Sequence, residues 1–123
     1  MSTLPEARDA LQTALEAAGI RVTRDPQGLP AAAPAAMLYG DGVDTSHIGR
    51  GQVIAGFRIL LVAGAWDGAS TADVLAGLVS TCLTVLRAMD GWPVGVVGPD
   101  SAVRIGSNAL LGADVQTSTV VTV

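Results

Sequence analysis

The segment QVIAGFRILLVA, residues 52–63, has the clearest strand pattern in this chain. Its side chains would alternate between the two faces of a sheet. One face would carry Val53, Ala55, Phe57, Ile59, Leu61 and Ala63, and the other Ile54, Arg58, Leu60 and Val62. Both sets are mostly apolar, which is typical of a strand covered on both faces. We therefore predict a central strand, covered on each side by helices or by a neighbouring subunit.

Arg58 is the one charged residue in this strand. If the strand is covered, the guanidinium group needs a carboxylate or backbone partner, because an unpaired buried charge is costly. A salt bridge inside the fold and one across a subunit boundary would both meet that need.

The segment after this strand predicts a helix followed by further strands. Ser70 and Asp73 have the spacing of a capping box, at the start of a helix that would end near Met89. The apolar stripe of that helix comprises Leu75, Leu78, Val79, Cys82, Leu86 and Met89. Its width indicates heavy burial, so Cys82 is expected to be a small buried residue. Beyond the helix the chain is β-rich, and residues 108–123 alternate as a half-exposed strand.

The segment before the central strand begins with another helix, over residues 4–18. Thr3 and Glu6 have capping-box spacing, and Gly19 follows as the stop. A short strand, a proline-rich extended connector over residues 24–34, and a strand from residue 35 come next. The order α-β-β-β-α-β-β, with one more strand at the end, predicts an α+β fold. Residues 1–123 would form a single domain, with two helices packed on a mainly antiparallel sheet.

The segment YGDGVDTSHIGRGQ, residues 39–52, contains most of the candidate chemistry. A P-loop needs a lysine, and the chain has none; a dinucleotide fingerprint needs a third glycine and a following helix. An EF-hand loop needs flanking helices and a terminal glutamate. Asp41 and Asp44 are the only acidic residues of this segment, and no glutamate follows them there. We therefore predict a long flexible hairpin loop at about residues 41–51 that reaches out and contacts a partner.

No enzyme signature emerges from the remaining reactive residues. His47 has no second histidine near it, and the G-x-S-x-G pattern is absent. Cys82 could pair with His47 on paper, but burial of a thiol disfavours its thiolate. We therefore predict no catalytic residue, no metal and no cofactor.

The composition narrows the possible partners. A formal net charge of −4 argues against a dedicated nucleic-acid binder, and the single cysteine excludes an intramolecular disulfide. The longest apolar-rich stretch is interrupted by Arg58 and no signal peptide is visible, so we expect a soluble protein that is cytoplasmic when made and has no membrane partner. Trp66, in a glycine-rich turn, either packs under the start of the following helix or anchors an interface.

Taken in order, these segments resemble the tail terminator proteins, also called minor tail or tail completion proteins, of long-tailed bacteriophages. The similarity lies in ARDALQTALEAAGIRV, DPQGLPAAAPAAMLYG, the loop ending in GRGQ, FRILLVAG, STADVL and LLGADVQTSTVVTV. It covers nearly all of the chain and includes no catalytic motif.

The resemblance implies a ring-forming virion protein, assembled in the host cytoplasm. A ring, usually of six copies, would cap the tail tube, end its polymerisation and present a surface to the head-side connector, while DNA passes through without specific binding. The loop at 41–51 would order against a neighbour or the tube. The candidate interface residues are Asp41, Val43, Asp44, His47, Ile48, Arg50, Arg58 and Trp66. Two alternatives remain: a head–tail connector or neck ring protein, and a small ligand-binding α+β domain.

Overall fold

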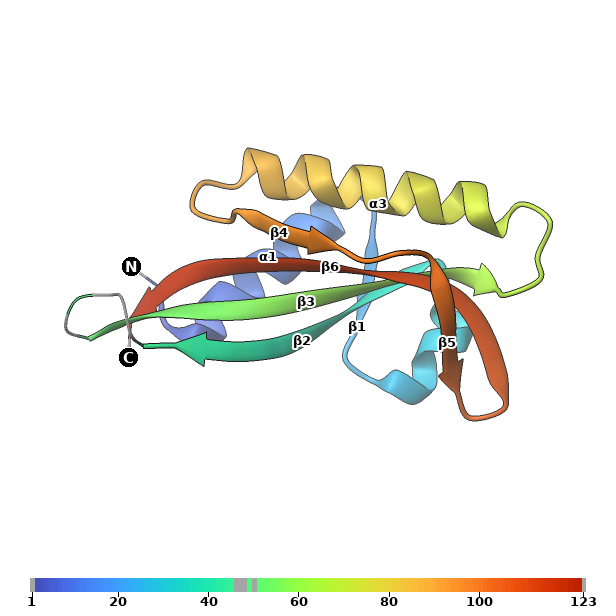
Figure 1. The fold of residues 1–123 in the computed structure, drawn as a ribbon, viewed down its shortest axis with the longest axis horizontal. Coiled ribbons are helices and arrows are strands. Elements are labelled where there is room, and N and C mark those ends of the chain that lie inside the picture. The colour runs from blue at the N-terminus through green and yellow to red at the C-terminus, as the bar shows by residue number, and fades with distance from the viewer. Residues whose placement is uncertain (1, 46–48, 50, 123) are drawn as a thin grey trace.

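A six-stranded sheet forms the body of the protein (Figure 1). The structure is a computed structural model that describes residues 2–45, 49 and 51–122. The strands are β1 (Arg21–Thr23), β2 (Ala35–Asp44), β3 (Gln52–Ala65), β4 (Val94–Val97), β5 (Ser101–Ile105) and β6 (Asn108–Thr122). They lie in the order β1-β2-β3-β6-β4, with β5 also paired to β6, and only β1 and β2 are parallel. The α+β class and the central position of β3 are confirmed.

Helices α1 (Leu4–Ala17) and α3 (Thr71–Ala88) cover one face of the sheet (Figure 1). The β3 residues predicted to share a face, Val53 through Ala63 at every second position, are all buried in this core. Leu11 and Leu15 of α1, with Leu75 and Cys82 of α3, pack against them.

The opposite face of the sheet is covered at one end only. There, a third, short helix α2 (Leu29–Ala32), which follows a 3₁₀ turn η1 (Pro26–Gly28), and strand β5 enclose a second apolar cluster. The rest of this face carries no helix (Figure 1). Within one subunit, the prediction that β3 is covered by helices on both sides is therefore wrong. Val62 is buried on this second face, but Ile54, Arg58 and Leu60 are only half-buried.

One of the two predicted capping boxes forms. The Thr3 hydroxyl accepts a hydrogen bond from the Glu6 backbone N–H (3.4 Å), and the Thr3 backbone N–H donates to the Glu6 carboxylate (3.2 Å). Hydrogen bonds from the Thr3 hydroxyl and backbone lower the pKa of Glu6. At the other end, Gly19 adopts a left-handed conformation with φ 88°. The second box is wrong, because the Ser70 side chain makes no cap hydrogen bond at the start of α3.

Two loop boundaries also differ from the sequence predictions. The connector at 24–34 is not wholly extended, because Pro26 and Pro30 start helical turns, where a missing N–H is tolerated. The hairpin loop is shorter than 41–51, because β2 continues to Asp44. A bulge follows Gly40, after which Val43 and Asp44 pair with Ala55 and Ile54. Gly40 and Gly42 therefore lie in an irregular strand instead of a loop.

Candidate functional site

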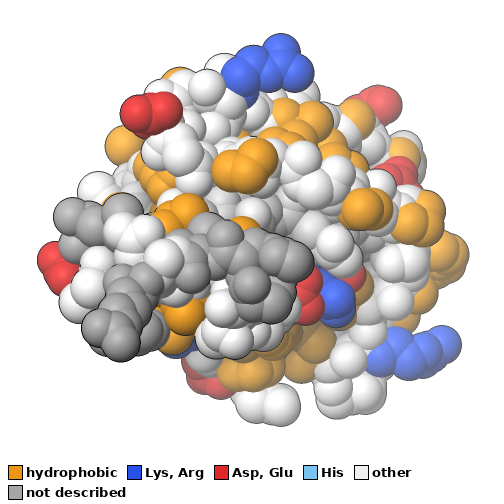
Figure 2. Space-filling view, turned by 60° about the vertical axis from the view of Figure 1, so that its left-hand side comes forward, with side chains coloured by type: hydrophobic (Ala, Val, Ile, Leu, Met, Phe, Trp, Pro, Cys, Tyr) orange, Lys and Arg blue, Asp and Glu red, His pale blue; other side chains and the backbone are white. Residues whose placement is uncertain are grey.

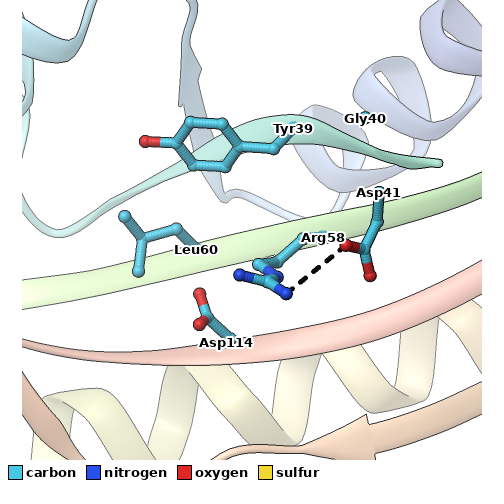
Figure 3. Close-up of a pocket in the computed structure, with 6 residues that line it drawn as sticks. All are labelled: Tyr39, Gly40, Asp41, Arg58, Leu60 and Asp114. Atoms are coloured by element: carbon cyan, nitrogen blue, oxygen red, sulfur yellow. Dashed lines mark hydrogen bonds and ion pairs between the residues drawn. The ribbon is translucent and has the colours of Figure 1, made fainter.

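The helix-free face of the sheet carries a shallow hollow of ≈ 380 Å³ (Figure 3). Strands β2, β3 and β6 contribute to it. In Figure 3, α1 and α3 lie behind the sheet. Its lining residues are Tyr39, Gly40 and Asp41 from β2, Arg58 and Leu60 from β3, and Asp114 from β6. These residues come together because Tyr39 lies opposite Arg58, and Leu60 lies opposite Asp114, in adjacent strand pairs.

Arg58 forms an ion pair at the centre of this hollow (Figure 3). Its Nη2 atom lies 3.3 Å from Oδ1 of Asp41, and the two side chains are 42% and 35% exposed. At that exposure a single ion pair contributes only about 0–1 kcal/mol to folding. The Nε atom of Arg58 is buried and has no hydrogen-bond partner among the described residues. The salt bridge predicted within the fold therefore forms. The Nε atom of the same guanidinium group, however, has no hydrogen bond among the described residues.

The bulge in β2 and a glycine in β3 position this ion pair. Asp41 lies within the irregular part of β2, between Gly40 and Val43. On β3, opposite the bulge, a Cβ atom added to Gly56 would lie 3.0 Å from the backbone oxygen of Asp41. Gly56 therefore lets the two strands approach closely where the Asp41 carboxylate turns toward Arg58.

A second hollow of ≈ 330 Å³ continues this surface along the hairpin. It shares Asp41 with the first and adds Val43, which is 51% exposed, Asp44 and Ile54. We call the combined region the open-face surface: Tyr39, Asp41, Val43, Asp44, Ile54, Arg58, Leu60 and Asp114. In Figure 2 the left-hand end of the molecule in Figure 1 faces the viewer. Hydrophobic side chains are interspersed there with uncharged polar side chains and backbone, and charged side chains are few and scattered.

The open-face surface offers ion-pairing and apolar contacts. Its charged groups in the first hollow are one guanidinium and two carboxylates, with the phenol of Tyr39 beside them. Across residues 2–45, 49 and 51–122, no three His, Cys, Asp or Glu side chains lie together as a metal site.

Of the eight predicted interface residues, the five that the structure describes do not form one site. Asp41, Val43, Asp44 and Arg58 lie on the open-face surface. His47, Ile48 and Arg50 lie outside the described residues. Trp66 follows the far end of β3, roughly 40 Å from the hairpin at the rise per residue of a strand. The alternative that Trp66 packs under the helix is wrong, because its side chain is 49% exposed.

Sequence reasoning missed Tyr39, Leu60 and Asp114 as members of this surface. Alternation had placed Leu60 on the same face as Arg58, and Asp114 lies in the segment 108–123 that was predicted to be a half-exposed strand. The missing information was the register between β3 and β6, which sets Leu60 opposite Asp114. The alternation within each strand leaves that register open, because it does not say which residue of the second strand lies opposite.

Cys82 is confirmed as a buried residue. Its side chain is 0% exposed, and burial raises the pKa of its thiol from 9.0 to about 12. The thiol therefore stays protonated at neutral pH and is no nucleophile.

No protein-family model matches this chain, and no curated protein is similar to it.

Proposed function

We propose that this chain is a structural protein of a phage tail, similar to tail terminators, that forms a ring of six copies on the end of the tail tube. The ring would end tube polymerisation and offer a surface for head attachment. Its partners would be further copies of the chain, the tube protein and a head-side connector. The phage assignment rests on the sequence resemblance described above, and the structure adds a surface suited to assembly.

The open-face surface is the observation that supports assembly. It combines exposed apolar side chains with an arginine whose Nε atom is buried and has no partner in the part of the chain that the structure describes. A neighbouring subunit seated there would cover the apolar groups and could pair with the exposed part of the Arg58 guanidinium group. In a cyclic ring this surface would meet a different surface of the next copy.

The net charge agrees with passage of DNA through such a ring. A formal charge of −4 per copy gives repulsion between the ring and the phosphate backbone, which keeps non-specific binding weak. A neck or connector ring would have the same property, and it is the runner-up. A ligand-binding domain fits less well, because the hollow at Arg58 is shallow, whereas ligand sites bury most of the ligand.

Native mass spectrometry of the purified chain, alone and with tail tubes, tests the ring. We expect a closed oligomer, with six copies the favoured count, and tubes of defined length when the chain is present during tube polymerisation. Arg58→Glu should break the ring, because it places a third acid beside Asp41 and Asp114. Its effect on the stability of the subunit should stay below about 1 kcal/mol.

Arg8→Glu is the matched control, since Arg8 is an exposed arginine on α1, away from the open-face surface. It should assemble as the wild type does. The proposal would be contradicted if the wild-type chain formed no ring either with or without tubes. It would also be contradicted if the Arg58→Glu variant formed rings as well as the wild type does. A thermal shift with a metabolite would instead favour the ligand-binding alternative.

A further inference from the structure

No described element covers the outer face of α3 (Figure 1), and this face has few charged side chains. A solvated helix normally carries charges along its outer side. Here the 18 residues of α3 contain two charged residues, Asp73 and Arg87. The helix is apolar enough to meet the length and composition of a membrane span, yet only 22% of it is buried in the fold. The exposed residues are Ala72, Asp73, Val74, Ala76, Gly77, Ser80, Thr84, Arg87 and Ala88.

Gly77 has no role inside the subunit. It lies in the interior of α3, where glycine destabilises a helix relative to alanine. A Cβ atom added there would meet nothing within 4 Å. Packing within the fold therefore does not explain the glycine, whereas close approach of another helix would.

The sequence of this outer face is complementary to itself when reversed about Ser80. The residues at equal distances on either side are Gly77 and Leu83, Ala76 and Thr84, Asp73 and Arg87, and Ala72 and Ala88. Asp73, Ser80 and Arg87 are seven residues apart and so lie along one line on the helix. In an antiparallel pair of these helices, each small residue would thus face a small residue or a larger apolar one. Each charged residue would face a residue of opposite charge.

We propose that α3 joins two copies of this chain, with the two helices antiparallel about a two-fold axis at Ser80. Asp73 of each copy then faces Arg87 of the other, in two symmetric ion pairs. Neither residue has an ion pair within the described part of its own chain. Leu83, which is half-buried, seats over Gly77 of the second copy, as a knob over a hole.

A hollow on α3 provides room for this contact. It measures ≈ 470 Å³ and is lined by Ser80, Leu83, Thr84, Arg87 and Ala88. The Thr84 hydroxyl already donates to the backbone oxygen of Ser80 (2.9 Å), so burial against a second helix leaves no unsatisfied donor there. This contact lies on the opposite side of the sheet from the open-face surface. The contact between two α3 helices is also isologous, because both copies use the same surface, whereas a ring joins two different surfaces. The pairing of α3 therefore goes beyond the proposed ring and does not depend on it.

Sedimentation equilibrium of the Arg58→Glu chain, over a hundredfold range of concentration, tests this pairing without interference from a ring. We expect a species of twice 12.4 kDa that grows with concentration. Gly77→Gln should weaken the association at least about tenfold, while its thermal midpoint, measured at a concentration where both chains are monomeric, stays equal to or above that of the parent. Thr13→Gln, at an exposed position on α1, is the matched control and should leave the association unchanged.

A charge exchange tests the antiparallel register. Asp73→Arg and Arg87→Asp should each weaken the dimer, and the double variant should restore it, because the two ion pairs re-form with reversed sign. Asp100→Arg, an exposed change of the same size away from α3, should have no effect. A parent that stays monomeric, or a double variant that stays weak, would overturn the proposal. So would binding to phosphatidylglycerol vesicles that Gly77→Gln abolishes, since α3 would then face lipid.

Discussion

Cys82 shows how a single buried group links the fold to pH. Burial raises the pKa of its thiol from 9.0 to about 12, so the folded protein keeps a proton that the unfolded chain loses above pH 9. The stabilising contribution is fully present below pH 9. Between pH 9 and 12 the unfolded state binds fewer protons, and the free energy of unfolding falls by at most roughly 1.4 kcal/mol per pH unit.

The comparison of wild type with Cys82→Ala isolates this effect, because all other titrating groups are common to both chains. Urea unfolding should find the wild type more stable at pH 8, since the substitution leaves a small cavity. That advantage should shrink as the pH rises from 9 to 11. An advantage that stays constant over this range, or a thiol that reacts rapidly with a thiol reagent at pH 8 in the folded protein, would show that Cys82 is not buried as described.

Among the elements, the pairing of β3 with β6 depends on a glycine. A Cβ atom added at Gly112 would lie 2.8 Å from the backbone oxygen of Leu61 and 2.8 Å from Cγ2 of Val103. Backbone on one side and a packed side chain on the other leave little room to adjust. Gly112→Ala should therefore destabilise the protein by about 1–3 kcal/mol, as measured by urea unfolding.

Gly40 supplies the comparison for that substitution. It also lies in a strand, but a Cβ atom added there would meet nothing within 4 Å. Gly40→Ala should therefore change the free energy of unfolding by less than Gly112→Ala does. The change at Gly40 can be a gain or a loss of stability. Equal losses from both substitutions would argue against the close approach of β5 and β6 at Gly112.

At the scale of the whole molecule, one core joins both long helices to the three long strands. The cluster on the helix-covered face contains residues from α1, α3, β2, β3 and β6. Trp92 closes it, with its ring 5.5 Å from that of Phe57. Because no part of this core is complete without the others, we expect the chain to unfold in one cooperative transition.

Trp66→Phe makes that expectation measurable, because it leaves the buried Trp92 as the only tryptophan. Fluorescence of this variant and far-ultraviolet circular dichroism should give the same urea midpoint within error. Two separate midpoints would indicate that the sheet and the helices unfold independently. The experiment is best performed at low concentration, so that association does not shift the midpoint.

Local patterns in the sequence were sufficient for most of the elements. Both long helices, the strand at 52–63 and the strand at 108–123 follow from periodicity, which depends on residues close together in the chain. The Thr3–Glu6 cap and the stop at Gly19 were also predictable, because each depends on a few neighbouring residues. The helical turns at 26–32 and the uncapped Ser70 were not predicted, because packing outweighed weak local preferences there.

The sequence by itself therefore determined the two long helices, the two longest strands and most residues of the main core. Only the tertiary structure decided which residues meet across strands: the bulge that turns Asp41 toward Arg58, and the register that brings Asp114 beside Leu60. It also decided that Trp66 is exposed and that α3 leaves an apolar face uncovered. The physical reason is that periodicity is a property of one segment, whereas register and exposure depend on segments that lie far apart in the chain.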